Sequence, residues 1–153
     1  MIIRAPVQED IETLTDLVFE MHQESDYAFL PYDRGKVRAL ILQYIEDQTT
    51  RCGLVAEDSQ SLIGMIGGVL VEYYFCEETL VADEVLFVRR ERRGGMAALR
   101  LIRGLQKWAE RQGARELCLS ISTNIHSETT GLFYERLGFS PVGGVFKKRL
   151  KNE

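Results

Sequence analysis

One segment constrains the fold more than any other: an apolar run over residues 79–88 passes directly into an arginine- and glycine-rich turn and then into an amphipathic helix. The turn holds four arginines and ends at Gly94 and Gly95. The start of a helix carries unpaired N–H groups and the positive end of the helix dipole, so it attracts phosphate. Glycines leave the backbone open, and arginines add fork-shaped donors. The segment predicts a pyrophosphate-binding loop, with a solvated basic turn as the alternative.

This loop does not fit the two best-known phosphate-binding patterns. A P-loop would have Gly-Lys-Ser/Thr after its glycines, and none follows here. A dinucleotide-binding turn would show G-x-G-x-x-G spacing in an opening βαβ unit, whereas this turn lies in mid-chain. Residues 88–98 resemble instead the acetyl-CoA loop of the GNAT N-acetyltransferase superfamily, whose centre reads R/Q-x-x-G-x-G/A. The matching residues are Val88, Glu91, Arg93, Gly94 and Ala98, while Met96 takes the place of the usual middle glycine.

A second motif follows at residues 130–139, Thr-Gly-Leu-Phe-Tyr-Glu-Arg-Leu-Gly-Phe. It resembles the late GNAT motif A-x-x-L/F-Y-E-K/R-L-G-F, and the two motifs come in the family's order. Leu132, Phe133 and Leu137 fall on one side of a short predicted helix, which Gly138 ends. The resemblance gives Tyr134 the role of an acid that protonates the departing CoA thiolate. A tyrosine that only packs in the core is the alternative.

The resemblance extends over the whole chain and predicts one GNAT-like domain over residues 1–153. The implied fold class is α/β (α+β), with a mixed, mostly antiparallel central sheet, about four flanking helices, and fourth and fifth strands that splay apart. Hydrophobic periodicity and turn residues agree with this order of elements. We expect strands at residues 2–4, 53–57, 62–73, 79–88 and 116–121, closing strands within 139–150, and helices at 7–24, 34–45, 94–112 and 128–137.

Composition narrows the partners and the compartment. The 153 residues carry a net charge of −4, which argues against nucleic acid as a partner despite the arginine cluster. No apolar run approaches the roughly 20 residues that span a membrane, and the first residues lack a signal-peptide layout. The three cysteines form no C-x-x-C pair, so we expect reduced thiols, no metal site and a cytoplasmic location.

The resemblance implies direct transfer of the acetyl group of acetyl-CoA to a primary amine. The pantetheine arm would pair with the backbone of Phe87 and Val88 like an added strand. Backbone N–H groups would hold the pyrophosphate, and they belong to Arg93, Gly94, Gly95, Met96, Ala97 and Ala98. A non-catalytic acyl-CoA-binding or interaction module on the same fold is the alternative function.

The base and the acceptor pocket are less strongly defined. Glu84 is the first candidate for the base and its neighbour Asp83 the second; since adjacent strand residues face opposite sides, at most one should point at the site. A water chain and Glu128 are further alternatives. The segment between the first two helices offers a mixture of carboxylates and rings that suits a cationic amine: His22, Glu24, Asp26, Tyr27 and Tyr32. The acceptor is a small-molecule or peptide amine, and a homodimer is an alternative to a monomer.

Overall fold

A computed structural model describes residues 1–150. Contacts divide the chain into two compact units, residues 1–120 and the residues from 121 onward. The single domain that the sequence predicts stays a prediction.

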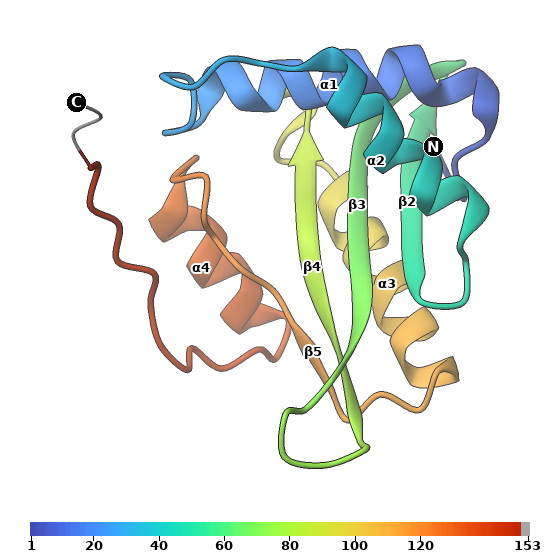
Figure 1. Ribbon diagram of the computed structural model, residues 1–153. Helices are drawn as coiled ribbons and strands as arrows, with labels where there is room; N and C mark the ends of the chain where they lie inside the picture. The colour runs from blue at the N-terminus through green and yellow to red at the C-terminus, as the bar shows by residue number, and fades with distance from the viewer. Residues whose placement is uncertain (151–153) are drawn as a thin grey trace. The chain divides into compact units, whose positions relative to one another are not determined.

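The first unit is built on a five-stranded sheet in the order β1-β2-β3-β4-β5 (Figure 1). Neighbouring strands run antiparallel, except that β4 and β5 are parallel. The mixed, mostly antiparallel sheet that the sequence predicts is therefore confirmed. The strands are β1 (Ile2–Arg4), β2 (Arg51–Asp58), β3 (Ser61–Glu72), β4 (Thr79–Val88) and β5 (Glu116–Cys118).

Helices cover both faces of this sheet. A side chain at Gly67 of β3 would meet Tyr44, whereas one at the adjacent Gly68 would meet Leu105. Successive strand residues point to opposite faces, so the helices that carry Tyr44 and Leu105 lie on opposite sides (Figure 1). These helices are α2 (Arg34–Glu46) and α3 (Ala97–Arg111); α1 (Ile11–Glu24) packs with α2. The apolar stripe of α3 is buried and consists of Leu101, Ile102, Leu105, Trp108 and Ala109.

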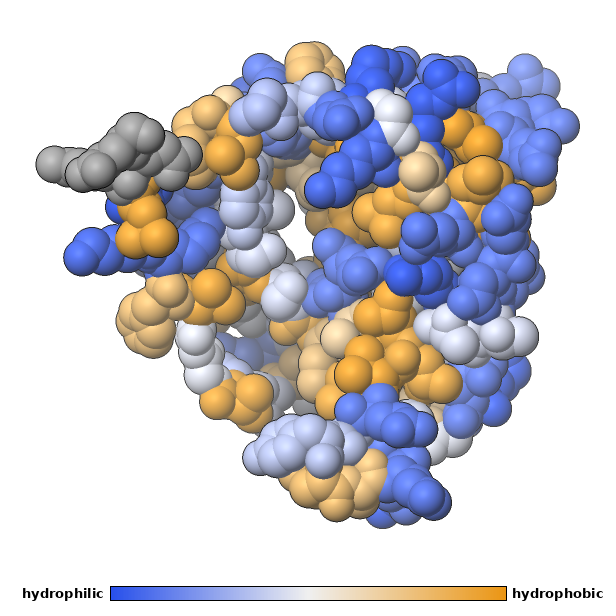
Figure 2. Space-filling model, in the orientation of Figure 1, coloured by the Kyte–Doolittle hydropathy of each residue, from blue (hydrophilic) through white to orange (hydrophobic). Residues whose placement is uncertain are grey.

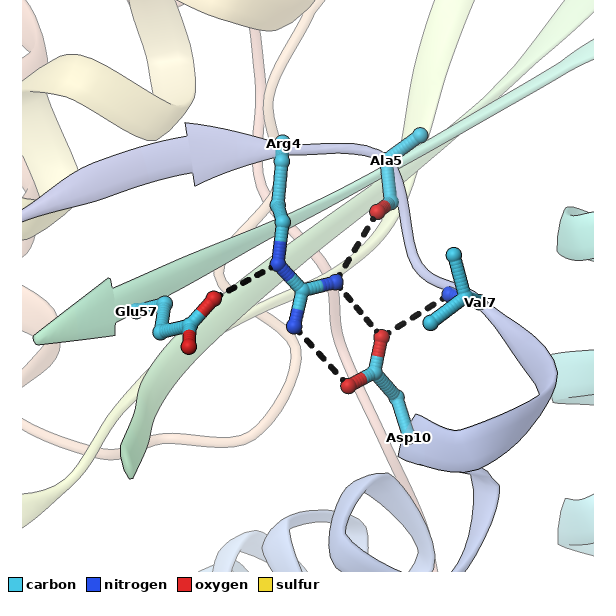
Figure 3. A network of polar contacts seen from close by, with 5 residues as sticks. All are labelled: Arg4, Ala5, Val7, Asp10 and Glu57. Carbon is cyan, nitrogen blue, oxygen red and sulfur yellow. Dashed lines mark hydrogen bonds and ion pairs between the residues drawn. The ribbon is translucent and has the colours of Figure 1, made fainter. Parts of the chain in front are cut away.

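An ionic network fixes the start of α1 to the first two strands (Figure 3). The guanidinium of Arg4 donates two hydrogen bonds to Asp10, at 2.7 and 3.0 Å, and one to Glu57, at 2.7 Å. The N–H of Val7 donates to the same Asp10 carboxylate at 2.8 Å, inside the short 3-10 turn η1 (Gln8–Asp10). The hydrogen bonds from Arg4 hold the pKa of Asp10 below its usual value.

The second unit contains α4 (Ser127–Arg136), which Gly138 follows with a φ of +94°. The predicted closing strands are wrong: residues 139–150 form no strand, and Val142 and Phe146 are 98% and 97% exposed. This stretch contains Pro141 and two glycines, and the described part of its own unit, residues 121–150, contains no strand with which it could pair. The four helices α1 to α4 agree with the predicted number.

The surface of the sheet between β2 and β4 is strongly apolar. Figure 2 shows hydrophobic atoms gathered on this face, below α1 and α2. Hydrophilic residues lie around the helices above it. This face carries the candidate site.

Candidate functional site

The pairing of β4 with β5 stops early and opens one edge of β4. The two strands pair only from Leu80 to Ala82, whereas β4 continues to Val88. Where the pairing ends, a carboxylate oxygen of Asp83 accepts hydrogen bonds from the backbone N–H and the hydroxyl of Ser120, at 2.9 and 3.0 Å. Burial raises the pKa of Asp83. The predicted splay is confirmed, and beyond Asp83 the β4 backbone has no β5 partner.

A β-bulge places Glu84 on the opposite side of the sheet from Asp83. Gly67 of β3 pairs with Val85 and Gly68 pairs with Asp83, so Glu84 is an extra residue without a partner on β3. Glu84 and Val85 consequently line the same pocket although they are adjacent in sequence. Asp83 is bound to Ser120 and does not line it. Of these two carboxylates, only that of Glu84 lines this pocket, and its role as the base stays a prediction.

Two side chains that sequence reasoning missed hold one oxygen of Glu84. The hydroxyl of Tyr44 donates to Oε2 in a short hydrogen bond, and Arg51 donates to the same oxygen at 3.2 Å. The Arg51 guanidinium also lies 5.3 Å from the centre of the Tyr44 ring. Burial and the neighbouring Glu84 raise the pKa of Tyr44. Within residues 1–150, Oε1 of Glu84 accepts no hydrogen bond, so this oxygen is available to a ligand.

The pocket beside Glu84 has a volume of about 160 Å³ and lies between α1, α2 and the sheet. Among residues 1–150, Glu84 is the only charged residue in its lining, and Tyr44 contributes the only other polar side chain. The remaining lining comes from apolar side chains and glycines, among them Leu14, Val18 and Met65. An apolar concavity with one carboxylate suits an organic cation.

The predicted phosphate loop presents free backbone donors. The residues after the 3-10 turn η2 (Arg90–Arg92) are not yet helical, because Gly94 has a φ of +81°. Helix α3 therefore begins at Ala97, three residues later than the sequence indicates. The N–H groups of Gly94, Gly95 and Met96 donate to no acceptor within residues 1–150, and the first helical turn adds further unpaired donors. The side chain of Met96 is 54% exposed.

Most arginines of this loop are engaged in ion pairs. Arg89 pairs with Glu20 at 3.3 Å, Arg92 with Asp58, and Arg93 with Glu24. Arg90 forms no ion pair within the described part of the chain. The arginines thus anchor the loop to α1 and β2, and the backbone N–H groups remain as donors for an anion.

The predicted acceptor residues lie apart from the pocket. His22 stacks near Phe19 and Tyr32, with ring centres 6.5 and 5.3 Å away, and its Nε2 is buried without a hydrogen-bond partner within residues 1–150. Glu24 is bound by Arg93, and the N–H of Tyr27 donates to Ser25 at 3.1 Å. None of the three lines the pocket at Glu84. Their acceptor role stays a prediction.

Tyr134 belongs to the second unit, where it lies on α4 and is buried. Its ring centre lies 6.1 Å from that of Phe133 and 6.0 Å from that of Phe139. Its backbone carbonyl accepts the N–H groups that close the helix end at Leu137 and Phe139. Tyr134 thus packs within its own unit, and its role as the acid stays a prediction.

Comparison with known proteins gives the family. A model described as the acetyltransferase (GNAT) family matches residues 13–139. The chain belongs to this family. No curated protein matches the chain.

Solved structures with this fold include several acetyltransferases. AAC(6')-Iy in complex with the bisubstrate analogue CoA-S-monomethyl-acetylneamine is 18% identical, with a TM-score of 0.76 over 99% of this chain and 98% of that chain. A ribosomal-protein-alanine N-acetyltransferase from Brucella melitensis biovar Abortus 2308 is 16% identical, with a TM-score of 0.75 over 98% and 100%. AAC(6')-IG from Acinetobacter haemolyticus is 15% identical, with a TM-score of 0.76 over all of both chains. These TM-scores show that the proteins share a fold with this chain.

Residues 1–150 were compared with the requirements of a membrane-spanning helix and of a metal site. No helix among them has the length and apolar character to cross a membrane. No three histidine, cysteine or acidic side chains within residues 1–150 gather closely enough to ligate a metal ion.

Proposed function

We propose that the protein transfers the acetyl group of acetyl-CoA to a primary amine. One observation carries the proposal: beyond Asp83, β4 has no β5 partner and leads into a loop whose N–H groups at Gly94, Gly95 and Met96 donate to no acceptor among residues 1–150. The edge suits the amides of a pantetheine arm, and the free N–H groups at the start of α3 suit a pyrophosphate. Complexes with CoA are known for proteins that share the fold, such as AAC(6')-Iy.

Glu84 supports the amine half of the reaction. Its Oε2 is held by Tyr44 and Arg51, which leaves Oε1 to bind the incoming ammonium and accept its proton. The neutral amine then attacks the thioester carbonyl and the carbon–sulfur bond breaks. The nitrogen releases a second proton as the amide forms, which balances the proton that the departing thiolate takes up. The CoA thiolate leaves and takes up a proton. By its motif, Tyr134 supplies that proton.

A non-catalytic acyl-CoA-binding module remains the second candidate. Met96 favours it, because a large side chain stands at the start of α3 where related loops carry glycine. Such a module would bind acetyl-CoA and acetylate nothing.

Calorimetric titration with acetyl-CoA tests the cofactor site, and the chain offers a matched pair of variants. Gly94 and Gly113 both have positive φ, +81° and +72°, and a side chain at either would meet no atom within 4 Å. Gly94→Asp places a carboxylate at the start of α3 and should weaken binding at least about tenfold by charge repulsion. Gly113→Asp introduces the same strain beyond the end of α3 and should leave binding unchanged. Equal affinity in the three proteins, or no binding by the wild type, would overturn the assignment.

A further inference from the structure

We propose that the acceptor is a primary amine carried on an apolar alkyl or aryl group of about six carbons, with this group bound in the pocket beside Glu84. The inference rests on the proposed acetyl transfer and names the chemical class of its acceptor. Acceptors with several charges or hydroxyls, such as aminoglycosides and polyamines, are predicted to be poor.

The lining of the pocket selects against polar acceptors. Of the described residues that line it, only Glu84 and Tyr44 have polar side-chain groups, and the Tyr44 hydroxyl is already bound to Glu84. A second ammonium group or a hydroxyl placed among Leu14, Val18 and Met65 would lose its water and find no partner. The binding of an apolar group would instead be favoured by the removal of its surface from water.

Glu84 fixes where the amine lies. Its side chain remains 40% exposed, while Oε2 is held by Tyr44 and Arg51. The free Oε1 therefore offers one well-placed acceptor for a single ammonium group. One carboxylate at the edge of an apolar pocket is complementary to one cation with one apolar group.

The volume sets the size of that group. Tyr44 packs closely against the sheet because Gly53 and Gly67 have no side chains; a Cβ there would come within 3.3 and 3.0 Å of it. The space left between this ring, α1 and the sheet is about 160 Å³. An apolar cavity of roughly 150 Å³ is large enough to bind benzene. A phenyl ring or a six-carbon chain therefore fits.

Steady-state kinetics with a homologous series of amines test the proposal. With saturating acetyl-CoA, kcat/KM should rise about fourfold per methylene from propylamine to hexylamine, as expected for burial of each CH₂. It should level off at octylamine, which exceeds the pocket. Hexylamine and phenethylamine should exceed spermidine and neamine at least about tenfold. A flat series, or a preference for spermidine or neamine, would overturn the proposal.

Two variants test whether the alkyl group of the amine binds in the pocket beside Glu84. Val18→Phe fills the pocket from α1 and should reduce kcat/KM for hexylamine at least about tenfold while changing that for propylamine less than about threefold. Val71→Phe makes the same replacement at a 42% exposed position of β3 outside the pocket lining and should change neither. Equal effects of both variants would contradict the assignment. The wild-type series decides the question on its own if Val18→Phe does not fold.

The test separates this inference from the proposed function. Acetylation of spermidine or neamine in preference to hexylamine overturns the acceptor class and leaves acetyl transfer standing. Acetyl-CoA binding without acetylation of any amine in the panel overturns both and supports the non-catalytic alternative.

Discussion

The contact between Arg93 and Glu24 should hold the cofactor loop in place. The guanidinium of Arg93 binds both carboxylate oxygens of Glu24, at 2.9 and 3.0 Å, and also donates to the carbonyl oxygen of Val88 at 2.9 Å. It lies 5.3 Å from the centre of the Phe87 ring. One side chain thus connects the end of α1, the end of β4 and the loop that presents Gly94. Without it, the free N–H groups would have to be ordered when acetyl-CoA binds.

The size of the effect follows from geometry and exposure. The two side chains are 24% and 28% exposed, so the pair lies between a surface ion pair and a buried one. A bidentate pair of this kind contributes about 1 to 1.5 kcal/mol. If this energy serves to order the loop, it corresponds to about a five- to tenfold change in the Kd of acetyl-CoA. Arg93→Ala also loses the contacts with Val88 and Phe87 and should weaken binding further.

A double-mutant cycle measures this coupling. Calorimetry on the wild type, Glu24→Gln, Arg93→Ala and the double variant should show that Glu24→Gln has almost no effect once Arg93 is absent. If the affinity of the double variant falls by the product of the two single effects, Arg93 and Glu24 do not act together on acetyl-CoA binding. An unchanged Kd in Glu24→Gln, together with a raised KM for the amine, would assign Glu24 to the acceptor instead.

Three further variants test separate parts of the account. Glu84→Gln should lower kcat/KM at neutral pH by about 10- to 1,000-fold and recover in part at higher pH, where free amine forms without a base; an unchanged pH–rate profile would exclude Glu84 as the base. Tyr134→Phe should reduce kcat by about 10- to 1,000-fold with little change in acetyl-CoA affinity, and full kcat would leave Tyr134 only a packing role. Asp10→Asn should lower the free energy of unfolding at pH 7 by about 2 kcal/mol, since it breaks the network with Arg4 and Val7. Because the pKa of Asp10 is lowered in the folded state, its contribution to stability is present above about pH 4 and is lost on further acidification. The free energy of unfolding, measured by urea denaturation, should therefore depend less on pH in this range for Asp10→Asn than for the wild type.

The parts of the structure that depend on local sequence were predictable. Three features can be recognised from a few neighbouring positions: the apolar run of residues 79–88, the glycines after it and the apolar stripe of α3. The start of α3 was placed three residues early because the helical periodicity does not reveal the positive φ of Gly94. The closing strands were wrong for a related reason: an apolar pattern shows that a segment can pair, but not that a strand edge is present beside it.

The surroundings of Glu84 depend on residues far apart in the chain and were not predictable. Tyr44 and Arg51 reach it from α2 and β2, 40 and 33 residues away. No local pattern connects them, and Tyr44 fits the apolar face of its helix as an ordinary core residue. The only available signal was general, namely that a buried tyrosine hydroxyl needs a hydrogen-bond partner. The hydrogen bonds from Arg93 to Glu24 join residues 69 positions apart, and no local pattern predicts them.

Isotope labelling shows whether the protein moves the acetyl group from CoA to an amine. The protein is incubated with acetyl-CoA labelled in the acetyl group and with hexylamine, and the products are followed by mass spectrometry. We predict one labelled N-acetylhexylamine for each CoA released, with Gly113→Asp equal to the wild type and Gly94→Asp strongly reduced at subsaturating acetyl-CoA. Release of CoA without labelled amide, or binding of acetyl-CoA with no product from any amine in the panel, would contradict the account.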